Sequence, residues 1–118
     1  MSLQLGNLTF DCDDPPKVAA FWSAALGLTI NEGGSEFFVS AVPADGQGPT
    51  WFFLKVPEPK TTKNRLHVDL VGDDPAAEID RLVALGATKV ADKDEWGHHW
   101  SVMNDVEGNE FCVSGPHA

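Results

Sequence analysis

Apolar and polar residues alternate along residues 64–70, whose sequence is Asn-Arg-Leu-His-Val-Asp-Leu. The apolar positions are Leu66, Val68 and Leu70, and the polar positions between them are His67 and Asp69. A period of two is typical of a β-strand that buries one face. The sequence therefore predicts a strand here, with His67 and Asp69 on the face opposite the core.

The same pattern occurs twice in the chain. Residues 7–15 and 67–75 alternate in phase and both end in Asp-Asp-Pro, which predicts a helix N-cap followed by Pro in the first turn. Helices are expected at about 15–26 and 75–85. Short strands are expected at 28–31, 37–42 and 51–56 in the first copy, and at 88–91, 99–103 and 110–114 in the second. The repeat predicts an α+β fold made of two βαβββ units.

Domain boundaries follow from this repeat. We expect one pseudo-symmetric domain over residues 1–118, with module one at about 1–57 and module two at about 64–115. Residues 58–63 form a linker between them. Pro57 and Pro59 make the chain stiff and extended at its start.

Composition narrows the function classes. The 118 residues are 42% hydrophobic, enough for a real core, and no apolar run approaches the roughly 20 residues of a membrane helix. A secretory signal pattern is also missing from the start of the sequence, so we expect a cytoplasmic protein with reduced cysteines. The net charge of −10 argues against a nucleic-acid partner, because phosphates would be repelled.

Three segments carry a family resemblance. They are the helical residues 21–27 (Phe-Trp-Ser-Ala-Ala-Leu-Gly), the turn 105–110 (Asp-Val-Glu-Gly-Asn-Glu), and residues 56–69, which end in Asn-Arg-Leu-His-Val-Asp. With the two βαβββ units, they resemble the vicinal oxygen chelate superfamily of glyoxalases, extradiol dioxygenases and bleomycin- and fosfomycin-resistance proteins. Within it, the chain is similar to small bacterial glyoxalase-like domain proteins. The resemblance implies a cupped mixed sheet with the helices outside, a small organic ligand and a homodimer.

The resemblance also implies where a metal would bind, on the first and last strands of each unit. The matching positions are Asn7 and His67 on the first strands, and Phe53 and Cys112 on the last, with Glu110 two residues before Cys112. A divalent ion needs several anionic or imidazole donors, and Asn7 and Phe53 do not supply them. We therefore expect either no cofactor or a weakly bound divalent metal on His67 and Glu110, with Cys112 as the only further donor.

Strand parity gives the candidate site. The predicted cup-facing residues are Asn7, Thr9, Trp51, Phe53, His67, Asp69, Glu110 and Cys112, joined by Trp100 from the His98-His99-Trp100 segment. The predicted helix-facing residues are Leu8, Phe10, Phe52, Leu54, Leu66, Val68, Phe111 and Val113. Glu110 and His67 are the predicted catalytic pair, and the other cup-facing residues are predicted to bind substrate.

Simpler interpretations stay open for each of these residues. His67 could only line a cavity, Glu110 could be an ordinary solvated residue, and Cys112 could be a small buried hydrophobe. The rings of Trp51 and Phe53 could be buried against a second subunit.

The leading functional hypothesis is a glyoxalase-like enzyme of the lyase or isomerase type. In such chemistry Glu110 would remove an acidic proton next to a carbonyl, while His67 or a metal holds the enolate. The alternative is a non-catalytic, drug-resistance type of binding protein with an aromatic cup and an incomplete metal site. A dimerising sensor or accessory domain is a third class.

Overall fold

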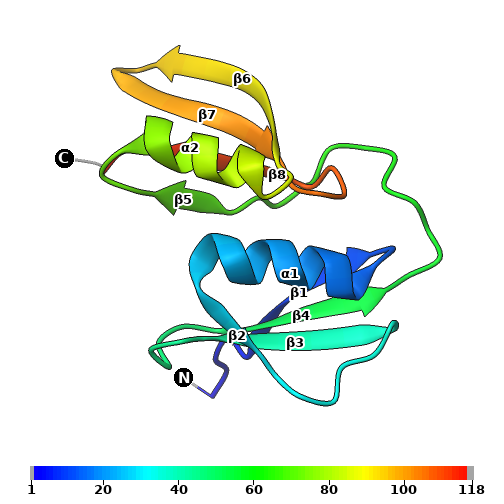
Figure 1. Cartoon of the computed structure of the whole chain (residues 1–118). Helices are drawn as coiled ribbons and strands as arrows, with labels where there is room; N and C mark the ends of the chain where they lie inside the picture. Colours follow the sequence, from blue (N-terminus) through cyan, green and yellow to red (C-terminus); the bar gives the residue numbers. More distant parts are fainter. Residues whose placement is uncertain (1, 117–118) are drawn as a thin grey trace. The chain divides into compact units, whose positions relative to one another are not determined.

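The computed structural model describes residues 2–116, which divide after Pro59 into two compact units. Each unit has the predicted βαβββ order, so the expected α+β class with two such modules is confirmed. Figure 1 shows one helix and one four-stranded sheet in each module. Within the described residues, no helix is both long and apolar enough to cross a membrane.

Module one forms a mixed sheet with strand order β1-β4-β3-β2, in which β1 and β4 are parallel and the other pairs antiparallel. Its elements are β1 (Asn7–Cys12), α1 (Pro15–Leu26), β2 (Leu28–Ile30), β3 (Phe38–Pro43) and β4 (Thr50–Lys55). The first strand begins at Asn7, and the Leu3 and Leu5 side chains before it are exposed.

Module two repeats this topology with strand order β5-β8-β7-β6 and a parallel β5–β8 pair. Its elements are β5 (Asp69–Val71), α2 (Pro75–Ala84), β6 (Thr88–Glu95), β7 (His98–Asn104) and β8 (Glu110–Ser114). Strand β5 is shorter than predicted, while β6 and β7 are longer and form a hairpin closed by Trp96 and Gly97. Both turn residues have positive φ, 53° and 75°, as a type I′ turn requires.

The two helices begin in the same way. Asp14 caps α1 by accepting a hydrogen bond from the Lys17 N–H at 3.3 Å, and Asp74 caps α2 through the Ala77 N–H at 3.2 Å. Both cap residues have φ of −129°. The Asp-Asp-Pro repeat therefore predicted both helix starts correctly, and these carboxylates are explained by capping.

Aromatic rings fill the core of module one. Trp22 of α1 lies 5.6 Å from Trp51, and Phe10 of β1 lies 5.7 Å from Trp51 and 5.6 Å from Phe53, measured between ring centroids. Phe53 is fully buried and Trp51 nearly so. The expectation that Trp51 and Phe53 face an open cup is wrong, because both pack on the α1 side of the sheet.

The sheet register gives the physical reason. Leu8 pairs with Trp51 and Phe10 with Phe53, and paired residues in neighbouring strands point to the same face. Thr9 pairs with Phe52 as Asp69 pairs with Cys112, so Phe52, not Phe53, is the counterpart of Cys112. Because residues 51–54 are all apolar, alternation could not set the parity of this strand.

Two other predicted core residues are exposed. Leu54 lies on the sheet face away from α1 and is 41% exposed. Leu66 precedes the shortened β5 and is 73% exposed, so its prediction as a core residue is also wrong. By contrast, Phe111 and Val113 of β8 are buried as predicted.

Candidate functional site

A cleft of about 480 Å³ opens on the face of the module-two sheet opposite the one that carries Met103 and Phe111. Its lining includes the predicted residues His67, Asp69, Trp100, Glu110 and Cys112. The other lining residues are Lys63, Trp96, His98, His99, Val102 and Ser114. The cleft lies entirely within module two.

The strand register explains this gathering. Asp69 of β5, Cys112 of β8 and Val102 of β7 lie in one cross-strand row, and Ser114 and Trp100 lie in the next. Residues in one row share a sheet face, so all of these side chains project into the cleft. The alternate residues of β7 and β8, such as Met103 and Phe111, are fully buried.

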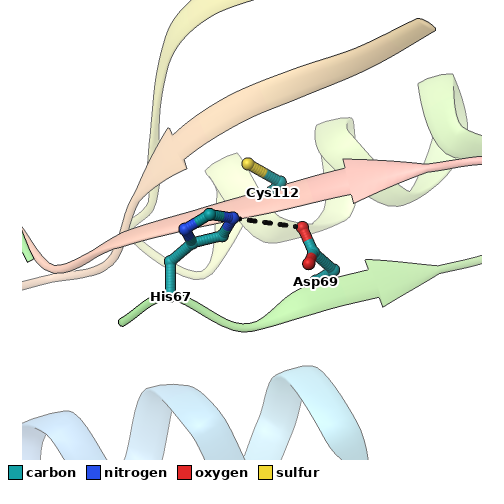
Figure 2. A group of neighbouring side chains, drawn as sticks. All are labelled: His67, Asp69 and Cys112. Atoms are coloured by element: carbon teal, nitrogen blue, oxygen red, sulfur yellow. Dashed lines mark ion pairs between the residues drawn. The ribbon is translucent and has the colours of Figure 1, made fainter. Parts of the chain in front are cut away.

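Three side chains with metal-ligating atoms meet at the floor of the cleft. The Nε2 atom of His67 lies 3.4 Å from an Asp69 carboxylate oxygen, and one ligand atom from each of His67, Asp69 and Cys112 lies within 4.8 Å of the others. Figure 2 shows the His67–Asp69 pair beside the Cys112 thiol on β8. Cys112 is buried, whereas His67 and Asp69 are exposed to the cleft.

Burial, and then the negative charge of Asp69, raise the pKa of the Cys112 thiol. The thiol is therefore protonated near neutral pH and is a poor nucleophile, since the thiolate is the reactive form. Its place beside a carboxylate is the opposite of the electropositive setting that activates a cysteine.

The same three side chains could hold a divalent metal. Imidazole, carboxylate and thiolate are the donor types of catalytic zinc sites, which use three protein ligands and keep one position open. Metal binding here must displace the thiol proton, which the raised pKa of Cys112 opposes, so the affinity is reduced. The donors fit a weakly held ion, and the group consists of His67, Asp69 and Cys112 without Glu110.

Glu110 is occupied by other contacts. One carboxylate oxygen accepts a hydrogen bond from the Asn64 N–H at 2.9 Å, and the other forms an ion pair with the Lys60 ammonium at 3.1 Å. Burial tends to raise the pKa of the Glu110 carboxyl, but these partners outweigh it and leave the pKa below its ordinary value. Glu110 thus ties residues 60–64 to the edge of the cleft.

The remaining predicted site residues lie in module one. Asn7 donates a hydrogen bond to the Thr9 hydroxyl at 2.9 Å on the sheet face away from α1. Trp51 and Phe53 are in the core on the other face. None of these four side chains is in the module-two cleft.

Sequence reasoning missed several residues of the cleft, above all Trp96 at the β6–β7 turn. The Trp96–Gly97 pair carried a usable signal, because Gly at the second position of a two-residue hairpin turn is favoured. That turn would have predicted a long hairpin and brought Trp96 and His98 to the cleft with Trp100.

Comparison with protein families supports the assignment of this fold. Residues 7–114 match the glyoxalase-like domain family. The chain belongs to this family, and with it to the vicinal oxygen chelate superfamily. A search of curated proteins found no match.

Solved structures of this superfamily have the same fold. A glyoxalase/bleomycin resistance protein/dioxygenase family enzyme from Burkholderia phytofirmans is 18% identical, with a TM-score of 0.76 over 96% of this chain and 98% of that one. A possible glyoxalase from Bacillus cereus is 17% identical, with a TM-score of 0.72 over 96% and 99%. A variant of the fosfomycin resistance protein FosX from Listeria monocytogenes, complexed with Mn(II) and a dihydroxypropylphosphonic acid, is 14% identical, with a TM-score of 0.77 over 97% and 90%.

Proposed function

We propose that the protein is a glyoxalase-like enzyme of the lyase or isomerase type, acting on a small organic molecule in the module-two cleft. The observation that carries this proposal is the His67–Asp69 pair at the floor of a cleft walled by indole rings. Such a site combines an apolar enclosure with a few convergent polar groups, as small-molecule sites do.

His67 is the proposed proton-transfer residue. The Asp69 carboxylate lies 3.4 Å from Nε2, which leaves Nδ1 as the ring nitrogen that can accept a proton from the substrate. In the reaction, the electron pair of a C–H bond next to a carbonyl becomes the enolate as the proton moves to His67. Glu110 keeps a role at the site, but as the residue that positions Lys60 and Asn64 and not as the base.

A metal would add to this chemistry if it binds. The FosX variant was crystallised with Mn(II), and the His67, Asp69 and Cys112 donors fit a weakly held divalent ion. A bound ion supplies Lewis-acid stabilisation of the substrate oxygen. The homodimer and the cytoplasmic location implied by the sequence stay predictions.

A non-catalytic binding protein is the second candidate. It is favoured by the ion pair that occupies Glu110 and by the protonated Cys112 thiol, since both leave His67 as the main reactive group. Such a protein would use the same cleft to sequester a small molecule.

Exchange of carbon-bound protons tests the proposal without knowledge of the product. Wild-type protein is incubated in D₂O with a panel of small α-hydroxy ketones and α-hydroxy aldehydes, and loss of the α-proton signal is followed by ¹H NMR. We expect wild-type protein to exchange the α-proton, and His67→Ala to reduce the exchange rate about 100-fold or more. Asn7→Ala, at the matching position of module one, should leave the rate unchanged.

The outcomes separate the two candidates. Saturable binding that depends on His67 without any exchange would favour the binding protein. Equal exchange by wild type and His67→Ala, with melting temperatures within a few degrees of each other, would contradict the role of His67.

A further inference from the structure

Trp96 is an outlier in two respects. It is the only non-glycine among the described residues with a positive φ, 53°, and its side chain is 85% exposed. A bulky residue is disfavoured in this backbone region, where Asn and Gly are preferred, and a large exposed indole adds no burial to the fold. The folded state therefore gains little from Trp96 at this turn, which points to a role outside stability.

Trp96 contacts a second indole that also lines the cleft. Its ring stacks nearly parallel to that of Trp100, with centroids 6.5 Å apart and an interplanar angle of 14°. Both indoles line the cleft that contains His67 and Asp69. The other tryptophans, Trp22 and Trp51, are buried in module one.

The polar groups of the cleft complement this aromatic wall. Lys63, His67, His98 and His99 all line it, and each can donate a hydrogen bond to an oxygen atom. Aromatic rings prefer offset-stacked contacts with indoles over contact with a saturated ring of the same shape.

We infer that Trp96 and Trp100 form a stacking subsite for a flat aromatic or heteroaromatic ring whose oxygen substituent points to the donors of the cleft. This rests on the proposed function, because it names the class of substrate for the same cleft. Trp96 is then the specificity-determining residue, held at the tip of the hairpin against its conformational preference.

The test compares two ligands that differ in aromaticity. Binding of 2-naphthoate and of decahydro-2-naphthoate to the full chain is measured by titration calorimetry and by the indole N–H signals in ¹H–¹⁵N spectra. We expect wild type to prefer naphthoate by about 3- to 10-fold, with shifts confined to the Trp96 and Trp100 signals. In Trp96→Asn this preference should disappear, while Trp96→Phe should keep most of it.

Stability gives an independent readout. Asn adopts positive φ readily, so Trp96→Asn should melt at the same temperature as wild type or higher. A clear drop in melting temperature, or an unchanged preference for naphthoate, would overturn the subsite. So would absence of naphthoate binding, or a change from dimer to monomer in Trp96→Asn with the preference intact, which would make the indole a contact between copies.

His67→Ala separates this inference from the proposed function. The substitution leaves both indoles in place, so the naphthoate preference should persist even though proton exchange is lost. If exchange is never detected but the preference depends on Trp96, the subsite stands and the enzymatic proposal falls.

Discussion

Asn7–Thr9 and His67–Asp69 occupy the same place in the two modules. The two residues of each pair are two positions apart in the sequence. Asn7 and Thr9 lie in β1 on the sheet face away from α1, whereas His67 precedes β5, Asp69 begins it, and both line the cleft. In module one the contact is an amide–hydroxyl hydrogen bond of 2.9 Å, and in module two it is an imidazole–carboxylate pair at 3.4 Å. The same place in the repeat thus carries neutral polar side chains in one module and ionisable side chains in the other.

The two helices differ in how many of their residues are buried. Helix α1 buries Pro15, Val18, Ala19, Phe21, Trp22 and Ala25, whereas α2 buries Leu82 alone. Module one buries the aromatic residues Phe21, Trp22, Trp51 and Phe53 in its core, whereas Trp96 and Trp100 of module two line a cleft. The two modules thus share helix caps and strand order, and they differ in the side chains on the sheet face opposite the helix.

The largest expected effect is on stability, and it tests which residues of β4 face α1. Phe53→Ala should lower the free energy of unfolding by about 3–5 kcal/mol, because this fully buried ring contacts Phe10. Phe52→Ala, on the opposite face, should cost roughly 1–2 kcal/mol. Urea unfolding of the two variants measures the difference, and a larger loss for Phe52 would reverse the assignment of faces.

Metal binding should distinguish His67 of module two from Asn7, its counterpart in module one. Zn²⁺ should bind weakly to wild type and be removed by dialysis against EDTA, since the Cys112 thiol must lose its proton. His67→Ala and Cys112→Ser should each reduce affinity about 10-fold or more, and Asn7→Ala should not change it. Calorimetric titration at constant pH checks this, and stoichiometric Zn²⁺ that survives EDTA would contradict it.

The smallest expected effect concerns Glu110, whose counterpart in the repeat is Thr50. Because the pKa of Glu110 is lowered in the folded state, its contribution is present above the ordinary carboxyl pKa of 4.5 and is lost as the pH falls below it. Glu110→Gln should therefore reduce the free energy of unfolding by about 1 kcal/mol or less at pH 7, and by a smaller amount at pH 3. Thermal melts at the two pH values measure this, with Thr50→Val as a control that should show no such pH dependence.

Much of the fold could be predicted because its signals are local. The Asp-Asp-Pro phrase fixes the start of each helix, and the alternation around His67 placed it with Asp69 on the correct face. The faces of Trp51 and Phe53 could not be predicted, because an uninterrupted apolar run has no period. The contacts of Glu110 with Lys60 and Asn64 could not be predicted either, because these residues are about 50 positions away in the sequence.

Because β5 pairs with β8, the last strand of module two, the cleft can form only late in synthesis of the chain. Strand β5 emerges early in module two, but its partner β8 is the final strand of the described chain. The nascent polypeptide therefore carries His67 and Asp69 without their neighbour Cys112 until translation has passed Ser114. Module one, whose own last strand ends at Lys55, is free to fold well before that point. A ribosome stalled before residue 110 would carry every strand of module one, but His67 and Asp69 would lack the β8 strand that completes the cleft.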